Sequence, residues 1–141
     1  MPTRTASAQW TGTLKEGTGK INSTTGAVSA QYSVGSRFEE GTGTNPEELL
    51  AAAHAACFSM AFTANLEKAG FNPEKIVTTD NVHIEKLEEG WKITLIEIQT
   101  EATVSGIEND KFQEIALETK AGCPVSKALA SVTFELDAKM V

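Results

Sequence analysis

The sequence contains only two cysteines, Cys57 and Cys123, among its 141 residues. Two cysteines are too few for the disulfide framework of a small secreted protein. In a reducing compartment a merely structural pair would stay as thiols. The question is therefore whether these two residues are inert core thiols or a redox pair.

Positive charge is also scarce: the sequence has 12 lysines and arginines against 19 acidic residues, and its net charge is -7. Nucleic acid as the main partner needs a cationic face, so this balance argues against it. It also argues against electrostatic docking on anionic membranes. A small neutral or apolar substrate is compatible with this charge.

Long hydrophobic runs and an apolar leader are missing as well. The first ten residues contain no apolar core of signal-peptide length. The strongest apolar run, residues 49–64, contains His54 and Ser59 and is shorter than the roughly 20 residues of a spanning helix. We therefore expect a soluble, cytoplasmic protein with no membrane partner, folded as a single domain over residues 1–141.

The motifs of nucleotide-dependent enzymes and serine hydrolases are absent. Gly41-Thr42-Gly43-Thr44 lacks the lysine of a phosphate-binding loop. His54 and Cys57 are spaced for a shared metal ion, but no second cluster would complete four ligands. We interpret His54 as a satisfied core histidine and His83 as a solvent-facing strand residue.

The first half of the chain predicts strands followed by one long helix. Apolar and polar residues alternate within residues 5–34, which predicts an antiparallel meander with a turn at residues 17–19. Residues 35–45 are expected to form a loop. Asn45 as N-cap and Pro46 at the first position, with acids in the first turn, predict a helix to residue 69, closed by Gly70.

The second half predicts a long hairpin, two further helices and a closing strand. The hairpin covers residues 76–87 and 91–104, and a change of phase between Leu95 and Ile96 suggests a bulge. A helix is expected over residues 109–121, with its buried stripe at Phe112, Ile115, Ala116 and Thr119. A short helix through residue 130 and a strand over residues 132–140 follow, which gives an α+β fold.

The long helix is apolar nearly all round, and residues 51–56 are almost all alanine. Such a helix is expected to be buried rather than amphipathic. A single sheet would cover only one side of it in a chain of this size. The pattern therefore suggests a second subunit on the other side.

Each cysteine allows an inert and a reactive interpretation. A buried thiol such as Cys57 has a raised pKa and needs a cation, for example Arg37, to become a nucleophile. Cys123 precedes Pro124 and is placed as the N-cap of a short helix, where N–H groups and the dipole favour a thiolate. A capping cysteine without redox role fits the same position.

Two sequence blocks and their spacing resemble the osmotically inducible protein C (OsmC) family, which has the organic hydroperoxide resistance proteins as a sister branch. The likeness extends over essentially the whole chain and favours the OsmC branch. The blocks are Arg37-Phe38 with residues 43–49 and 52–60 around the first cysteine, and residues 120–126 around the second.

The resemblance implies a two-cysteine peroxidase that reduces organic hydroperoxides in oxidative or osmotic stress defence. Cys57 would be the reactive thiol, Cys123 the resolving thiol, Arg37 the activating cation and Glu47 its carboxylate partner. It further implies an OsmC-like fold, with curved antiparallel sheets around long buried central helices in an intertwined homodimer. No metal or haem is implied, and an external thiol or dithiol, lipoyl-linked among other candidates, would reduce the disulfide.

The chemistry implied by the resemblance suits these residue types. A Cys57 thiolate would attack the O–O bond and become a sulfenic acid, which Cys123 converts to a disulfide. Apolar neighbours in sequence, Phe38, Phe58 and Met60, would favour a hydroperoxide with an organic tail. Two alternatives stay open, a stoichiometric redox sensor or stress-binding protein, and a structural protein with inert thiols.

One geometric expectation does not depend on the resemblance. Glu47 and Cys57 are ten positions apart on one predicted helix, which is about 15 Å along a straight axis. They cannot meet within one chain unless the helix is broken. Any grouping of Arg37, Glu47 and Cys57 should therefore use both subunits or a break in the helix.

Overall fold

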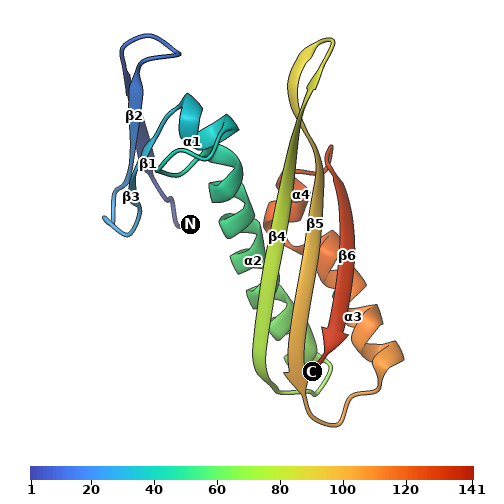
Figure 1. Ribbon diagram of the computed structural model, residues 1–141. Coiled ribbons are helices and arrows are strands. Elements are labelled where there is room, and N and C mark those ends of the chain that lie inside the picture. The colour runs from blue at the N-terminus through green and yellow to red at the C-terminus, as the bar shows by residue number, and fades with distance from the viewer. The chain divides into compact units, whose positions relative to one another are not determined.

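The computed structural model describes residues 1–141 and divides into two compact units, Met1–Leu49 and Leu50–Val141. Each unit has its own three-stranded sheet (Figure 1). Four helices complete the chain, which makes it an α+β protein.

The first unit is the antiparallel meander that the alternation predicts. Its strands β1 (Ala6–Thr11), β2 (Thr18–Ser23) and β3 (Ser29–Tyr32) pair in chain order. Thr18 already belongs to a strand, so the predicted turn at residues 17–19 lies too late. Gly19 pairs with both Trp10 and Tyr32, and a Cβ there would lie 2.3 Å from the Tyr32 ring. A glycine is needed because the ring crosses the strand at that point.

The predicted loop after β3 is in part a helix, α1 (Val34–Phe38). A capping box starts it, since Ser36 N–H donates to Ser33 Oγ at 3.1 Å and Ser33 N–H donates to Ser36 Oγ at 2.8 Å. A helix of five residues is too short to show apolar periodicity. The prediction of a loop throughout residues 35–45 was wrong here for that reason.

The long helix α2 (Pro46–Lys68) begins and ends as its sequence predicts. Asn45 Oδ1 accepts the backbone N–H of Glu48 at 2.7 Å. At the other end Gly70 takes a φ of 94°, and the Phe71 N–H reaches back to the Leu66 carbonyl at 2.9 Å. These bonds form a glycine-based helix stop. The helix is continuous between them.

Helix α2 is long and apolar enough to meet the criterion for a membrane-spanning helix, with a mean hydropathy of 1.4 over its most apolar window. The predicted run of residues 49–64 is thus part of a longer apolar helix. Core helices of soluble proteins meet the same criterion, and α2 packs one face into the second unit. The buried side chains on that face are Phe58, Phe62 and Leu66.

The second sheet is built on the predicted hairpin, β4 (Pro73–Leu87) and β5 (Gly90–Val104). His83 pairs with Leu95 and Ile84 with Ile93, so the extra residue of the bulge is Thr94, one position before the predicted place. The closing strand β6 (Thr133–Met140) pairs with β5 in parallel. The expectation of antiparallel sheets is therefore wrong for this sheet, which is mixed.

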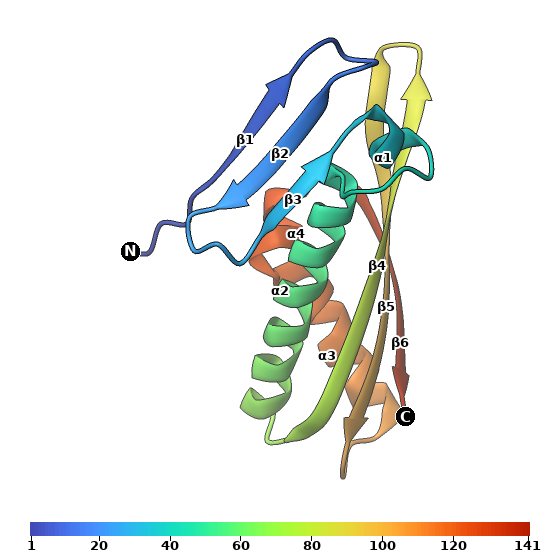
Figure 2. The ribbon, with the colours of Figure 1, turned by 60° about the vertical axis from the view of Figure 1, so that its left-hand side comes forward.

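Two helices connect β5 to β6 and explain the parallel pairing. They are α3 (Asn109–Gly122) and α4 (Pro124–Ala128), and a parallel neighbour requires such a crossover. Helices α2 and α3 lie on the same face of the second sheet (Figure 2). The core between them contains the predicted stripe of α3 and side chains of β5: Phe112, Ile115, Ala116, Ile96, Ile98 and Ala102.

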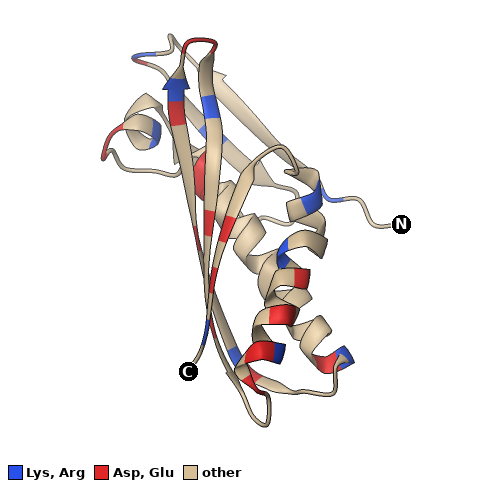
Figure 3. Cartoon of the chain, turned by 90° about the vertical axis from the view of Figure 1, so that its right-hand side faces the viewer, with Lys and Arg blue, Asp and Glu red and all other residues tan.

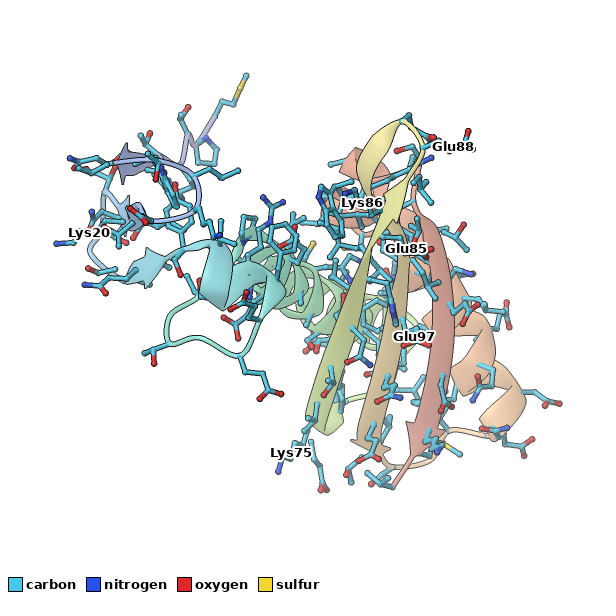
Figure 4. All side chains as sticks on the ribbon, turned by 45° about the horizontal axis from the view of Figure 1, so that its top comes forward. Lys20, Lys75, Glu85, Lys86, Glu88 and Glu97 are labelled. Atoms are coloured by element: carbon cyan, nitrogen blue, oxygen red, sulfur yellow. The ribbon has the colours of Figure 1, made fainter.

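Charged side chains lie mainly on the outer surfaces of these elements. Figure 3 shows acidic residues along the strands of the second sheet and along α3. Figure 4 shows Glu97 on the sheet, with Lys86 and Glu88 toward the hairpin end. His83 pairs there with Glu97 at 2.9 Å and is 45% exposed, which confirms its predicted solvent-facing position.

Candidate active site

The second unit brings the two cysteines together. Cys57 lies on α2, and its Sγ is 2.9 Å from Sγ of Cys123 at the junction of α3 and α4. Both are free thiols, Cys123 fully buried and Cys57 half-buried. A disulfide has an S–S length of about 2.05 Å, so only a small movement separates the pair from a covalent bond.

Cys123 ends α3 and caps α4, with Pro124 at the first position of the second helix as predicted. Burial alone would raise its pKa. The Cys57 thiol, the Ser126 hydroxyl and the backbone N–H groups of Ser126 and Val125 stabilise the thiolate and outweigh burial, so the pKa of Cys123 lies below its ordinary value. A thiol of this kind is a good attacking and leaving group in disulfide exchange.

The pKa of Cys57 shifts in the opposite direction. Burial, followed by the hydrogen bond with Cys123, raises the pKa of the Cys57 thiol, and the groups acting on it include no cation. This agrees with the expectation from the sequence that Cys57 needs a positive charge from elsewhere.

The expected apolar neighbours of the substrate differ in exposure. Phe58 is a core residue with 0% exposure, whereas Met60 is 76% exposed.

Arg37 and Glu47 form an ion pair within the first unit. Arg37 Nη2 donates to Glu47 Oε1 at 2.7 Å, and Nε lies 3.1 and 3.2 Å from the two carboxylate oxygens. Glu47 is thereby more than a first-turn acid that stabilises the helix. The carboxylate binds two guanidinium nitrogens, which fixes the plane of the group and leaves Nη1 unengaged. The guanidinium also lies over the Phe38 ring, 5.2 Å from its centroid.

His54 is a buried and fully hydrogen-bonded histidine, as the sequence suggests. Its Nδ1 binds Asp80 Oδ2 on β4, and its Nε2 lies 2.8 Å from Ser126 Oγ on α4. Both ring nitrogens are hydrogen-bonded, so neither is available to bind a metal ion together with Cys57. Asp80 and Ser126 were missed by sequence reasoning, because neither has a local signal and His54 lies on a different element.

Comparison with known proteins decides the family. The family model described as OsmC-like protein matches residues 39–137. A relative in Escherichia coli, called peroxiredoxin OsmC, is 45% identical over 134 residues, which cover 94% of each chain. The chain belongs to the OsmC family.

Solved structures show that the fold is OsmC-like. The organic hydroperoxide resistance protein OhrB of Bacillus subtilis has a TM-score of 0.74 and 25% identity, and the match covers 97% of this chain and 98% of that one. An OsmC-like protein of Mycoplasma pneumoniae has a TM-score of 0.76 at 13% identity, covering 99% and 98%. The OsmC family match includes Glu47, Cys57 and Cys123, whereas Arg37 lies just before it.

Proposed function

We propose that this OsmC-family chain is a thiol-dependent peroxidase that reduces organic hydroperoxides to alcohols. The observation that carries the proposal is the pair of free thiols 2.9 Å apart, one of them with a lowered pKa. A relative called a peroxiredoxin and a fold neighbour called an organic hydroperoxide resistance protein support the same activity.

The proposed cycle has three steps. The Cys57 thiolate attacks the hydroperoxide, so that an S–O bond forms and the O–O bond breaks. The departing alkoxide takes up a proton, equivalent to the one that Cys57 lost on ionising, and leaves as the alcohol. Cys123 then attacks the Cys57 sulfenic acid, which gives the disulfide and water. An external thiol or dithiol reduces the disulfide, and lipoyl-linked dithiols are among the candidates. No metal or haem takes part.

The cation for Cys57 is proposed to come from Arg37 of a second chain. Because α2 is continuous from Pro46 to Lys68, position 57 lies about 15 Å along the axis from Glu47, to which Arg37 is bound. A break in the helix, the other way to bring the three groups together, is not observed. The proposed site therefore combines the Arg37–Glu47 pair of one protomer with Cys57 of its partner.

Co-expression of two inactive chains tests this arrangement. We expect Arg37→Ala and Cys57→Ser chains each to be inactive alone, while their mixed dimer regains one complete site and about half of the wild-type activity per dimer. Each inactive chain co-expressed with itself is the control. A mixed dimer, isolated by two different tags, that stays inactive would contradict a site built from two chains.

The homodimer itself is proposed from the exposed face of α2. Only 22% of its apolar window is buried within the chain. Ala53, Ala56, Met60 and Ala64 form an exposed stripe at helical spacing on that face. Small side chains allow close approach of a second copy, and the stripe would become buried in an intertwined dimer around the two central helices. We propose that residues 1–141 act as a single domain in this assembly.

The stripe gives a prediction on oligomeric state. Met60→Glu places a charge on the proposed interface and is expected to convert the dimer to monomers at micromolar concentration, measured by sedimentation velocity. Leu117→Glu changes a side chain that is 55% exposed on α3 and serves as the matched control. A wild-type protein that sediments as a monomer, or a Met60→Glu dimer of unchanged affinity, would argue against this interface.

The proposed activity is tested at steady state. A panel of organic hydroperoxides and hydrogen peroxide is crossed with glutathione, a dithiol such as dihydrolipoamide, and thioredoxin. We expect multiple turnovers and faster reduction of organic hydroperoxides than of hydrogen peroxide. A single turnover with every reductant would instead indicate a stoichiometric redox sensor.

With its acidic charge, the protein is proposed to act in the cytoplasm without nucleic acid or membrane.

A further inference from the structure

A hydrogen-bonded chain of polar side chains runs through the second unit and ends at Ser126, in the first turn of the helix that Cys123 begins. Asp80 binds His54 Nδ1, and His54 Nε2 lies 2.8 Å from Ser126 Oγ. The Ser126 hydroxyl in turn is one of the groups that favour the Cys123 thiolate. The chain joins β4, α2 and α4. The side chains of His54 and Asp80 are completely buried, and Ser126 is 5% exposed.

We propose that Ser126 and His54 take up the proton of Cys123 when this thiol attacks the oxidised Cys57, and that Asp80 is a positioning residue that orients the His54 ring. The proposal rests on the peroxidase cycle above and concerns its second step alone. It assigns a role to three buried polar groups that the Arg37–Glu47 pair and Cys57 leave unexplained.

The order of the hydrogen bonds determines which way the proton moves. Asp80 accepts the Nδ1 hydrogen, so in the neutral ring Nε2 is an acceptor and the Ser126 hydroxyl donates to it. The Ser126 oxygen can then accept from the Cys123 S–H. For a thiolate the sequence reverses: Ser126 donates to sulfur and His54 Nε2–H donates to Ser126. The two states differ by one proton moved from Cys123 to His54.

Asp80 is the group that faces the His54 ring from the other side. Its second oxygen, Oδ1, is buried and has no hydrogen-bond partner. A buried carboxylate that lacks part of its hydrogen bonding is stabilised by a positive charge on its neighbour. In the proposed step, the proton that reaches His54 places a positive charge next to this carboxylate.

The proposed step balances in atoms and charge. The S–H bond of Cys123 breaks, its proton moves to Ser126 Oγ, and the proton of Ser126 moves to His54 Nε2. The thiolate then forms the S–S bond while the S–O bond of the Cys57 sulfenic acid breaks. The departing hydroxide takes back the proton that His54 stored and leaves as water.

Rapid-quench mass spectrometry separates the two steps of the cycle in the full-length protein. After mixing with cumene hydroperoxide, the loss of Cys57 thiol reports oxidation, and the conversion of sulfenic acid to disulfide reports resolution. For Ser126→Ala we expect an unchanged oxidation rate and a resolution rate lower by about tenfold or more at pH 7. The backbone N–H groups that face Cys123 remain in this variant.

The pH dependence of the resolution rate should also change. Without the Ser126 hydroxyl the pKa of Cys123 rises, so the midpoint of the resolution rate is expected at higher pH. The titratable groups around the chain are Cys57, His54, Asp80 and two lysines, Lys120 and Lys127, which line the hollow beside Ser126. Because the lysines are unchanged, a shift in Ser126→Ala is assigned to the hydroxyl.

Three further variants complete the test. Ser126→Thr keeps the hydroxyl and should restore resolution, and Asp80→Asn should slow it without slowing oxidation. Thr100→Val removes another buried hydroxyl, one that is 3.0 Å from Thr78 Oγ1, and should leave both rates unchanged. Equal slowing of both steps in Ser126→Ala, or an unchanged resolution rate and pH midpoint, would overturn the proposal. A wild-type protein that forms no Cys57 sulfenic acid would instead refute the peroxidase.

Discussion

Replacement of Cys57 by serine is expected to lower the rate of cumene hydroperoxide reduction by at least about 1,000-fold, because a serine hydroxyl cannot act as a soft, ionisable nucleophile toward the O–O bond. Ser and Cys have the same shape apart from the atom exchanged. The loss should therefore appear in steady-state turnover without a change in the unfolding midpoint in urea.

The matched control for this variant is Ser59→Ala, two positions further along α2. Its hydroxyl donates to Thr78 Oγ1 at 2.8 Å, so the substitution also perturbs a hydrogen-bonded position of the helix. We expect Ser59→Ala to retain most of its activity. Full steady-state activity in Cys57→Ser would refute the assignment of this residue.

The Cys123→Ser variant should separate the two halves of the cycle. Its Cys57 is expected to react once with hydroperoxide at a rate near that of the wild type, since the Arg37–Glu47 pair is unchanged. The sulfenic acid then has no thiol 2.9 Å away to condense with and should accumulate. Dimedone labelling of Cys57, read by mass spectrometry, measures this species.

Steady-state turnover of Cys123→Ser with a dithiol is expected to fall strongly, because the reductant must then attack a half-buried sulfenic acid directly. If the variant formed no sulfenic acid, Cys123 would be needed for the first step and the assigned order of the two thiols would be wrong. Retention of full turnover would show that no resolving cysteine is required.

Local signals in the sequence predicted those parts of the fold that depend on neighbouring residues. Asn45 and Pro46 start α2, Gly70 ends it, and the buried stripe of α3 contains the predicted Phe112. Each of these follows from capping or periodicity within a few residues. The five residues of α1 were missed because a helix that short has no periodicity.

Long-range partners could not be predicted in the same way. The alternation of β6 fits a parallel and an antiparallel neighbour equally well, and only the crossover through α3 and α4 decides between them. The bond between His54 and Asp80 joins two elements through the fold, and a strand aspartate gives no sign that it will be buried. Likewise, spacing alone did not pair Cys57 with Cys123, whereas the family blocks did.

The central claim is that Cys57 and Cys123 form a reversible redox pair driven by organic hydroperoxide. Peptide mapping of the reduced protein after one equivalent of cumene hydroperoxide tests it most directly. We predict one alcohol formed per chain and a Cys57–Cys123 disulfide that a dithiol reduces back to two thiols. Two cysteines that remain alkylatable after the hydroperoxide treatment, with no disulfide-linked peptide, would contradict it.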